Sequence, residues 1–256
     1  MIFPTSVALF FLGAVVASFI GVVVARLYTG QSVCTGRSHC DACGTVLPPF
    51  ALIPIISHFV LGGRAHCCGA RVSFYAPITE CILGTFFVLS YFKLDLSSAL
   101  PLMLVSITLL LALVLYDLSH QVLPSILLFP FIVASMITGF LLAPSLAEFF
   151  ATLFTAFLIA ASLAFIHFIS RGRAMGFADA PLSFGLALLV GPAAFPGFVF
   201  SFWIGALLGI VVLARRPRGS RMGVEVPFAP YLATGFLLAY FSQWNPFIFT
   251  TILFQN

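Results

Sequence analysis

The sequence has very little charge. Only 7% of its 256 residues are charged, and the charged set contains a single lysine, Lys93. A soluble domain is about one quarter charged. Hydrophobic residues make up 62% of the chain, and 31 residues are phenylalanine. Such a chain cannot stay dispersed in water, which excludes a soluble protein and predicts an all-α, polytopic membrane protein.

The N-terminus also lacks something. Residues 1–4 contain no basic residue of the kind that precedes the apolar core of a cleaved signal peptide, so we expect the first apolar run to be a retained helix. A membrane helix needs about 20 mostly apolar residues. About eight runs fit this description: 3–27, 77–92, 99–116, 123–142, 146–169, 181–194, 197–213 and 227–241. We expect Pro196 to separate the sixth run from the seventh.

The arginines predict how these spans are oriented. They lie in or beside odd-numbered connections, whereas Lys93 lies in the second connection. By the positive-inside rule, the odd-numbered connections face the cytoplasm and both termini face outward. The arginines are Arg26, Arg37, Arg64, Arg71, Arg171, Arg173, Arg215, Arg216, Arg218 and Arg221.

The first connection is the only one long enough for a small domain outside the membrane. Five of the six cysteines fall between Cys34 and Cys68, and they include Cys40-x-x-Cys43. In a reducing compartment this spacing favours a metal over a disulfide framework. No internal repeat is evident. We therefore divide the chain into a first helix (1–27), a cysteine loop (28–76) and a membrane core (77–256).

A zinc site is predicted in this loop, and the identity of its fourth ligand stays open. A four-thiolate site usually has a second Cys-x-x-Cys, and none is present. Vicinal cysteines are not expected to bind one ion comfortably, so a histidine stays in contention, and a metal-free loop is the alternative. The predicted ligands are Cys40, Cys43, Cys68 and Cys67, with His66 as an alternative fourth ligand and Cys34 as a further candidate.

Two of the seven acidic residues stand out. The other five fit ordinary roles as solvated charges, as a salt-bridge partner or as part of a helix start: Asp41, Glu80, Asp95, Glu148 and Glu225. Asp117 and Asp179 each lie beside a long apolar run, on the same side of the predicted membrane. Because an ionisable group at such a position is costly, it marks a candidate functional site.

A pair of carboxylates suits peptide hydrolysis. Two carboxylates held close together cannot both ionise readily, so they share one proton. The ionised member activates a water while the protonated member donates to the scissile carbonyl, and neither aspartate has a fixed role. Gly176 lets the backbone approach closely, and the small side chain of Ala178 leaves room beside the carboxylate of Asp179. The alternative is that each aspartate caps a helix or pairs with Arg171 or Arg173.

Taken in order, these residues resemble the long form of the bacterial type IV prepilin peptidases, over nearly the whole chain. The similar segments are Ala17-Ser18-Phe19, residues 39–44, Ile53-Pro54, Gly63-Arg64, Cys68-Gly69, Pro77 with Glu80, residues 117–124, residues 176–179 and residues 227–233. The chain departs from the family pattern at Ala65, Ser125, Ala178 and Pro181.

The resemblance implies an aspartyl endopeptidase in the bacterial inner membrane. Asp117 and Asp179 would be its catalytic pair at the cytosolic boundary, where it removes the short basic leader of prepilins or pseudopilins. It also implies possible N-methylation of the new N-terminus with S-adenosylmethionine, for which Glu80 is a weak candidate residue. The expected partners are these substrates and the lipid bilayer, with no nucleic acid, and the oligomeric state is open.

Two other functions remain open from the sequence. One is a membrane transporter in which Asp117 and Asp179 bind protons or ions, although such sites usually lie near the middle of the bilayer. The other is a catalytically lapsed homologue that acts in assembly, which the altered residues Ser125, Ala178 and Pro181 keep possible.

Overall fold

The computed structural model describes residues 2–29, 32, 37–40, 42–173, 175–215 and 227–244. Within these residues the secondary structure is helical, with two isolated β-bridges and no strand, so the all-α prediction is confirmed. Some residues that stood out in the sequence lie outside the described part: Cys34, Asp41, Arg216, Arg218, Arg221 and Glu225.

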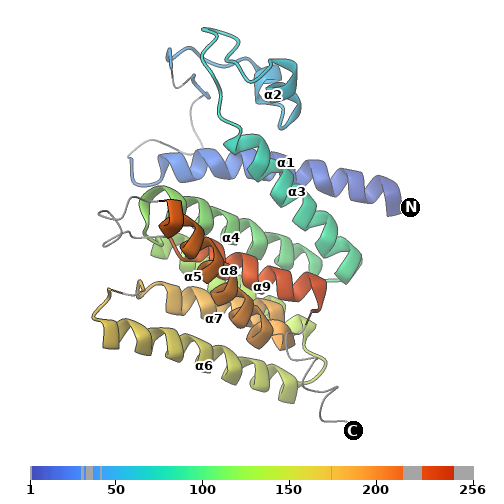
Figure 1. The fold of residues 1–256 in the computed structure, drawn as a ribbon. Helices are drawn as coiled ribbons and strands as arrows, with labels where there is room; N and C mark the ends of the chain where they lie inside the picture. Colours follow the sequence, from blue (N-terminus) through green and yellow to red (C-terminus); the bar gives the residue numbers. More distant parts are fainter. Residues whose placement is uncertain are drawn as a thin grey trace. The chain divides into compact units, whose positions relative to one another are not determined.

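The chain forms two compact units, Met1–Leu100 (unit 1) and Pro101–Asn256 (unit 2). Figure 1 shows their helices. Unit 1 contains α1 (Ile2–Arg26), η1 (Pro49–Leu52), α2 (Ile56–Val60) and α3 (Tyr75–Leu94). The remaining helices are α4 (Leu100–His120), α5 (Ser125–Leu142), α6 (Leu146–Ser170), α7 (Asp179–Val190), η2 (Gly191–Ala193), α8 (Ala194–Arg215) and α9 (Ala229–Ser242).

Six helices in the described part are long and apolar enough to cross a membrane, fewer than the eight predicted. Each predicted run does contain a helix. However, α7 and α8 belong to one continuous run, Asp179–Val211, and α9 has only 14 residues. The two helices are nevertheless separated, and the predicted position of the break, Pro196, was wrong: α7 ends at Val190, where Gly191 has a positive φ of 60°. Proline is tolerated in the first turn of a helix, and α8 begins at Ala194.

Unit 1 is built around the crossing of α1 and α3. Gly13 and Gly84 meet at this crossing, where an added β-carbon on Gly13 would lie 2.8 Å from the α-carbon of Gly84. The two backbones can approach this closely only because neither residue has a side chain. The rest of the unit, including η1 and α2, lies in the long connection between these helices.

Unit 2 is organised around α7. All of its 12 residues except Pro181 and Phe184 are buried or nearly so. It packs against α5, α6 and α9, and α9 also packs along α8. A helix covered on so many sides reads as apolar all round, with no polar face. The first residue of this central helix is Asp179.

The close crossing in unit 1 gives a stability prediction. We expect Gly13→Ala to destabilise the protein by about 1 to 3 kcal/mol, because the new methyl group overlaps backbone atoms that cannot move aside easily. The measurement is the thermal unfolding temperature of the detergent-purified protein. Gly21→Ala is the matched control, because no atom lies within 4 Å of a β-carbon placed there. Equal unfolding temperatures for the two variants would contradict the crossing.

Candidate functional site

Asp117 lies in the last turn of α4 and is only 5% exposed. The sequence predicted that this helix would end at Tyr116 and that Asp117 would lie in the following connection. Instead the helix continues to His120 and ends where Gln121 adopts a positive φ of 55°. Asp117 is therefore held by helical backbone, and His120 stacks on Tyr116 with ring centroids 4.3 Å apart.

The carboxylate of Asp117 is held by the start of α9. Its Oδ2 accepts a hydrogen bond of 3.2 Å from the backbone N–H of Ala229, the first residue of that helix. The N-terminus of a helix carries free N–H groups and the positive end of the helix dipole, which both favour a carboxylate. This contact joins residues 112 positions apart, and it was not predicted from the sequence.

Asp179 is the first residue of α7 and is 6% exposed. Its carboxylate accepts a hydrogen bond from the backbone of Gly176. A β-carbon placed on Gly176 would lie 3.4 Å from Oδ2 of Asp179, so this glycine leaves room for the carboxylate. The reason predicted for Gly176, close approach of its backbone to Asp179, agrees with this geometry.

The turn between α6 and α7 is tied back to α6 by His167. The two helices meet at the left-hand side of Figure 1. Nδ1 of His167 lies 2.9 Å from the carbonyl oxygen of Met175, and its ring packs against Phe177. These contacts fix the segment that leads directly into Asp179. This positioning role of His167 had no signal in the sequence.

The two carboxylates both lie in unit 2. They come from the end of α4 and the start of α7, and they are close enough to interact electrostatically. Among the residues that the structure describes, no ion pair joins either aspartate to Arg171 or Arg173, which was the alternative role considered for them. His167 is close enough to Asp179 to act on it electrostatically, and two buried carboxylates that lack an arginine partner can share a proton.

Unit 1 contains two hairpin turns with the same hydrogen bonds. In the first, the N–H of Gly44 donates to the carbonyl of Cys40 at 2.8 Å, and His39 pairs with Val46. In the second, the N–H of Gly69 donates to the carbonyl of Ala65 at 2.8 Å. Both glycines have positive φ, of 71° and 70°. The two turns share their backbone hydrogen bonds, although only a cysteine and the glycine after it recur at equivalent positions of their sequences.

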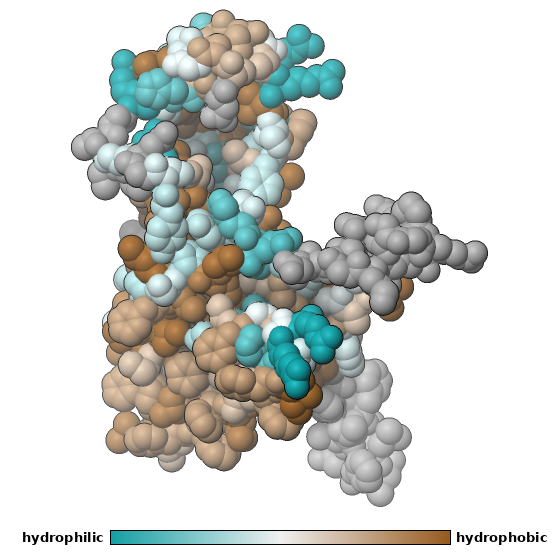
Figure 2. All heavy atoms as spheres, turned by 90° about the vertical axis from the view of Figure 1, so that its left-hand side faces the viewer, coloured by the Kyte–Doolittle hydropathy of each residue, from teal (hydrophilic) through white to brown (hydrophobic). Residues whose placement is uncertain are grey.

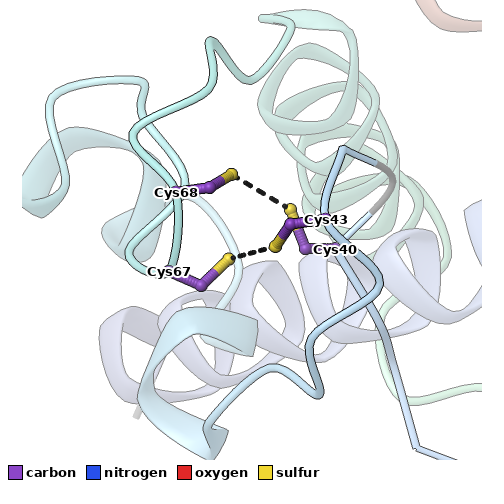
Figure 3. Close-up of side chains that lie close together, drawn as sticks. All are labelled: Cys40, Cys43, Cys67 and Cys68. Atoms are coloured by element: carbon purple, nitrogen blue, oxygen red, sulfur yellow. Dashed lines mark hydrogen bonds between the residues drawn. The ribbon is translucent and has the colours of Figure 1, made fainter.

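The equivalence of the two turns accounts for the irregular cysteine spacing. Cys43 corresponds to Cys68, whereas Cys40 corresponds to Ala65, so the second turn lacks one thiol. Cys67, which corresponds to Ala42 of the first turn, supplies the fourth thiol of the cluster. The sulfur atoms of all four cysteines lie within 4.8 Å of one another, and Figure 3 shows their side chains pointing toward a common centre.

The sulfur positions suit a tetrahedral metal ion. Sγ of Cys40 lies 3.8 Å from Sγ of Cys68, and Sγ of Cys43 lies 3.2 Å from Sγ of Cys67. A zinc–sulfur distance of about 2.3 Å gives a sulfur–sulfur distance of about 3.8 Å in a tetrahedron. The expectation that Cys67 and Cys68 would not share a site does not match this geometry. The ring of His66, the alternative ligand, packs instead against Phe50.

The thiol of Cys43 loses its proton more readily than an ordinary cysteine thiol. Hydrogen bonding to the side chain and backbone of Thr45 lowers the pKa of Cys43 to about 6. The hydrogen bond with Cys43 raises the pKa of Cys67 to about 12, so that this thiol keeps the proton that the pair shares. A metal ion at the centre would replace this proton, because metals bind the thiolate form.

Glu80 lies in a second polar region of unit 1. It is buried in α3, and its Oε2 accepts a hydrogen bond of 2.7 Å from the N–H of Ile55. Ile55 has a positive φ of 62°, which is rare for a β-branched residue, and the carboxylate stabilises it. Glu80 also lines a hollow of about 230 Å³ together with His58. His58 is buried, and neither ring nitrogen has a partner among the described residues.

Comparison with known proteins identifies the family. The model of the Bacterial Peptidase A24 N-terminal domain matches residues 11–94. A prepilin leader peptidase/N-methyltransferase of Bacillus subtilis is 31% identical over 236 residues, which cover 91% of this chain and 92% of the relative. The chain belongs to the prepilin leader peptidase/N-methyltransferase family.

Other members of the family show similar agreement. The prepilin leader peptidase/N-methyltransferase of Pseudomonas aeruginosa is 30% identical over 202 residues, covering 77% of this chain and 68% of the relative. The corresponding protein of Dickeya chrysanthemi is 28% identical over 275 residues, and the match covers 93% of this chain and 94% of the relative. No solved structure matches the chain. Together with the six apolar helices, the family identifies a multi-pass membrane protein.

The equivalence of the two turns gives a prediction about metal content. We expect Cys67→Ser to lower bound zinc from about one ion per chain to a small fraction, because one of four thiolates is lost. Adding Ala65→Cys to that variant should restore the ion, because Ala65 occupies the position equivalent to Cys40. The measurement is elemental analysis of the purified protein. Cys81→Ser is the control, because this thiol lies in α3 outside the cluster.

If Cys67→Ser retains its full zinc content, Cys67 is not a ligand. If the double variant stays without zinc, the two turns are not equivalent as metal-binding units.

Proposed function

We propose that this chain is a membrane aspartyl endopeptidase that removes the short basic leader of prepilin-like proteins. The observation that supports the proposal is that two buried carboxylates of unit 2, Asp117 and Asp179, interact electrostatically. The names of the relatives supply the substrate class, and the carboxylate pair supplies a chemistry that can cut a peptide bond.

The proposed reaction uses the pair as a unit. One carboxylate is ionised and takes a proton from a water molecule, which attacks the scissile carbonyl. The other carboxyl group donates its proton to the carbonyl oxygen. The N–H groups of Ala229 and Gly176 hold the two carboxylates in place throughout. The pair shares its proton between both members, so neither is assigned a permanent role.

The proposed location follows from the charges. We place the protein in the bacterial inner membrane with the aspartate pair at the cytosolic boundary, because Arg171 and Arg173 lie in the connection that leads to Asp179. A substrate whose apolar helix lies in the bilayer while its basic leader stays in water would bring its cleavage point to this boundary. No nucleic acid has a part in the proposal.

The cysteine loop, residues 28–76, has a structural role in this proposal. Cys40, Cys43, Cys67 and Cys68 would hold a zinc ion that ties the two hairpin turns together. This loop buries few residues of its own, so a metal ion would supply much of its folding free energy.

N-methylation of the new N-terminus is a second candidate activity, which the names of the relatives include. The observation that favours it is the hollow in unit 1. It brings together the buried carboxylate of Glu80, the ring of His58, whose nitrogens have no hydrogen-bond partner among the described residues, and apolar walls such as Leu52 and Pro77. S-adenosylmethionine carries a methyl group on a positive sulfonium, and a carboxylate in an apolar pocket would bind that cation favourably.

The aspartate pair can be tested directly. We expect Asp117→Asn and Asp179→Asn each to lower the rate of leader cleavage by about 10²-fold or more, because the shared proton and the base are both lost. The measurement is cleavage of a prepilin-like substrate by purified, membrane-reconstituted protein. Asp95→Asn is the matched control, since Asp95 is exposed and asparagine tolerates its positive φ of 51°.

A variant of either aspartate that cleaves at the normal rate would reject the pair. If the wild type itself does not cleave, the lapsed homologue is supported. Proton-coupled transport by wild type, lost in both variants, would support the transporter.

Glu80 allows the two proposed activities to be separated. We expect Glu80→Gln to lower methylation by about tenfold, because the charge that attracts the sulfonium is lost while Gln can still accept from Ile55. Cleavage should continue, because Glu80 lies outside the aspartate pair. Mass analysis of the processed N-terminus reports both the cut position and the methyl group. Glu148→Gln is the control, and parallel loss of cleavage and methylation in Glu80→Gln would contradict the separation.

A further inference from the structure

The second hairpin of unit 1 places two arginines directly opposite each other. Arg64 and Arg71 form an antiparallel bridge. The N–H of Val72 donates to the carbonyl of Gly63, and the N–H of Ala65 donates to the carbonyl of Ala70, both at 2.8 Å. Because these bonds flank the pair, it is a non-hydrogen-bonded pair, in which the α-carbons are about 4.5 Å apart and the side chains are closest.

This arrangement gathers positive charge on one face of the hairpin. Opposite residues in an antiparallel pair project from the same face, and like charges there are unfavourable. Both arginines are exposed, and no carboxylate of the described residues forms an ion pair with either of them. The first hairpin has His39 and Val46 at the equivalent positions, so the turn itself does not require two arginines.

A hollow of about 560 Å³ lies beside the pair. Arg64 and Arg71 both line it, together with Gly62, Gly63 and Phe74. Gly62 and Gly63 have positive φ and contribute no side chains to the hollow. Two guanidinium groups present planar sets of N–H donors that match the oxygen atoms of a phosphate group.

The chain enters the membrane next to this hollow. Arg71 is four residues before Tyr75, where the membrane-crossing helix α3 begins. Four residues span at most about 14 Å, and the headgroup layer on each side of the hydrocarbon core is about 5 to 8 Å thick. A connection this short leaves Arg71, with its long side chain, close enough to the start of α3 to reach lipid headgroups.

Apolar side chains accompany the charges. Val72 is 45% exposed and Phe74 is 61% exposed, and both line the hollow. Phe59 and Val60, at the end of α2, are also exposed. Figure 2 shows hydrophilic and hydrophobic side chains next to one another at the height that α2 has in Figure 1. Exposed apolar residues beside basic ones are typical of a surface that lies in the membrane interface.

We propose that Arg64 and Arg71 clamp the phosphate of an anionic phospholipid in the leaflet that α3 enters. Val72 and Phe74 contact the apolar part of the same lipid. The lipid neutralises the opposed charges and holds the second cysteine turn against the membrane surface. A zwitterionic lipid binds less well, because its own ammonium group competes for the phosphate.

The test is lipid binding by the full-length protein in detergent, measured by native mass spectrometry during titration with phosphatidylglycerol or phosphatidylcholine. The wild type should retain phosphatidylglycerol preferentially. Arg64→Gln and Arg71→Gln should each weaken this binding by about tenfold, the effect of losing one charge-assisted contact. Arg37→Gln is the matched control, because it removes one exposed arginine of the same unit outside the second hairpin and should leave binding unchanged.

The controls distinguish a specific lipid clamp from general charge attraction and from a site for soluble phosphate. Equal loss in Arg37→Gln would mean general attraction between charges and would overturn the clamp. Displacement of the lipid by millimolar glycerol phosphate would show a site for soluble phosphate and would overturn the lipid assignment. Unchanged phosphatidylglycerol binding in the Arg64→Gln/Arg71→Gln double variant would overturn the clamp.

Folding of the variants is checked by their zinc content and unfolding temperature. If the double glutamine variant is unstable, the Arg64→Lys/Arg71→Lys variant tests the clamp instead. This variant keeps both positive charges and loses the planar N–H donors. The clamp predicts weaker phosphatidylglycerol binding for this lysine variant, and binding equal to wild type would overturn it.

Discussion

The arrangement of unit 2 depends on burying two carboxylates among apolar helices. A buried carboxylate is costly unless it receives hydrogen bonds, and inside a helix the backbone N–H groups are already used. The available donors are at the starts of helices and in tight turns. Asp117 is bonded by Ala229 at the start of α9, and Asp179 by Gly176 in the turn before α7. The pair therefore lies at helix ends, where the polar leader of a membrane-bound substrate can also reach.

Much of the fold could be predicted from hydropathy, because a membrane leaves a chain little choice except the helix. Each of the eight apolar runs contains a helix. The helix ends were less predictable. The end of α4 depends on Gln121 and Pro124, since nothing in residues 117–120 stops a helix. The division between α7 and α8 depends on Gly191, whose positive φ of 60° ends α7 and leads into a 3₁₀ turn before α8.

The acidic side chains of the candidate site could be predicted from the sequence. The backbone group that binds one of them could not. Elimination among seven acidic residues singled out Asp117 and Asp179, because few charges occur in so apolar a chain. The N–H of Ala229 could not be predicted, since any residue except proline supplies one and the contact spans 112 positions. Similarly, the cysteines of the cluster were predictable, whereas the matching backbone hydrogen bonds of the two turns were not.

Unit 1 and unit 2 carry different chemistry. Unit 1 holds the thiol cluster, the hollow beside Glu80 and the arginine pair, all within or next to the connection between α1 and α3. Unit 2 holds the aspartates. The chain thus separates binding and metal sites from the proposed hydrolytic site, so that variants in one unit should leave the activity of the other measurable.

The most direct test of the central claim is a double-mutant cycle on leader cleavage with Asp117→Asn, Asp179→Asn and the variant that combines them. Residues that act as one unit show strongly non-additive effects. A shared proton predicts that the combined variant is about as slow as either single variant. If the two losses multiply in the combined variant, the aspartates act independently and the account of a single carboxylate pair is wrong.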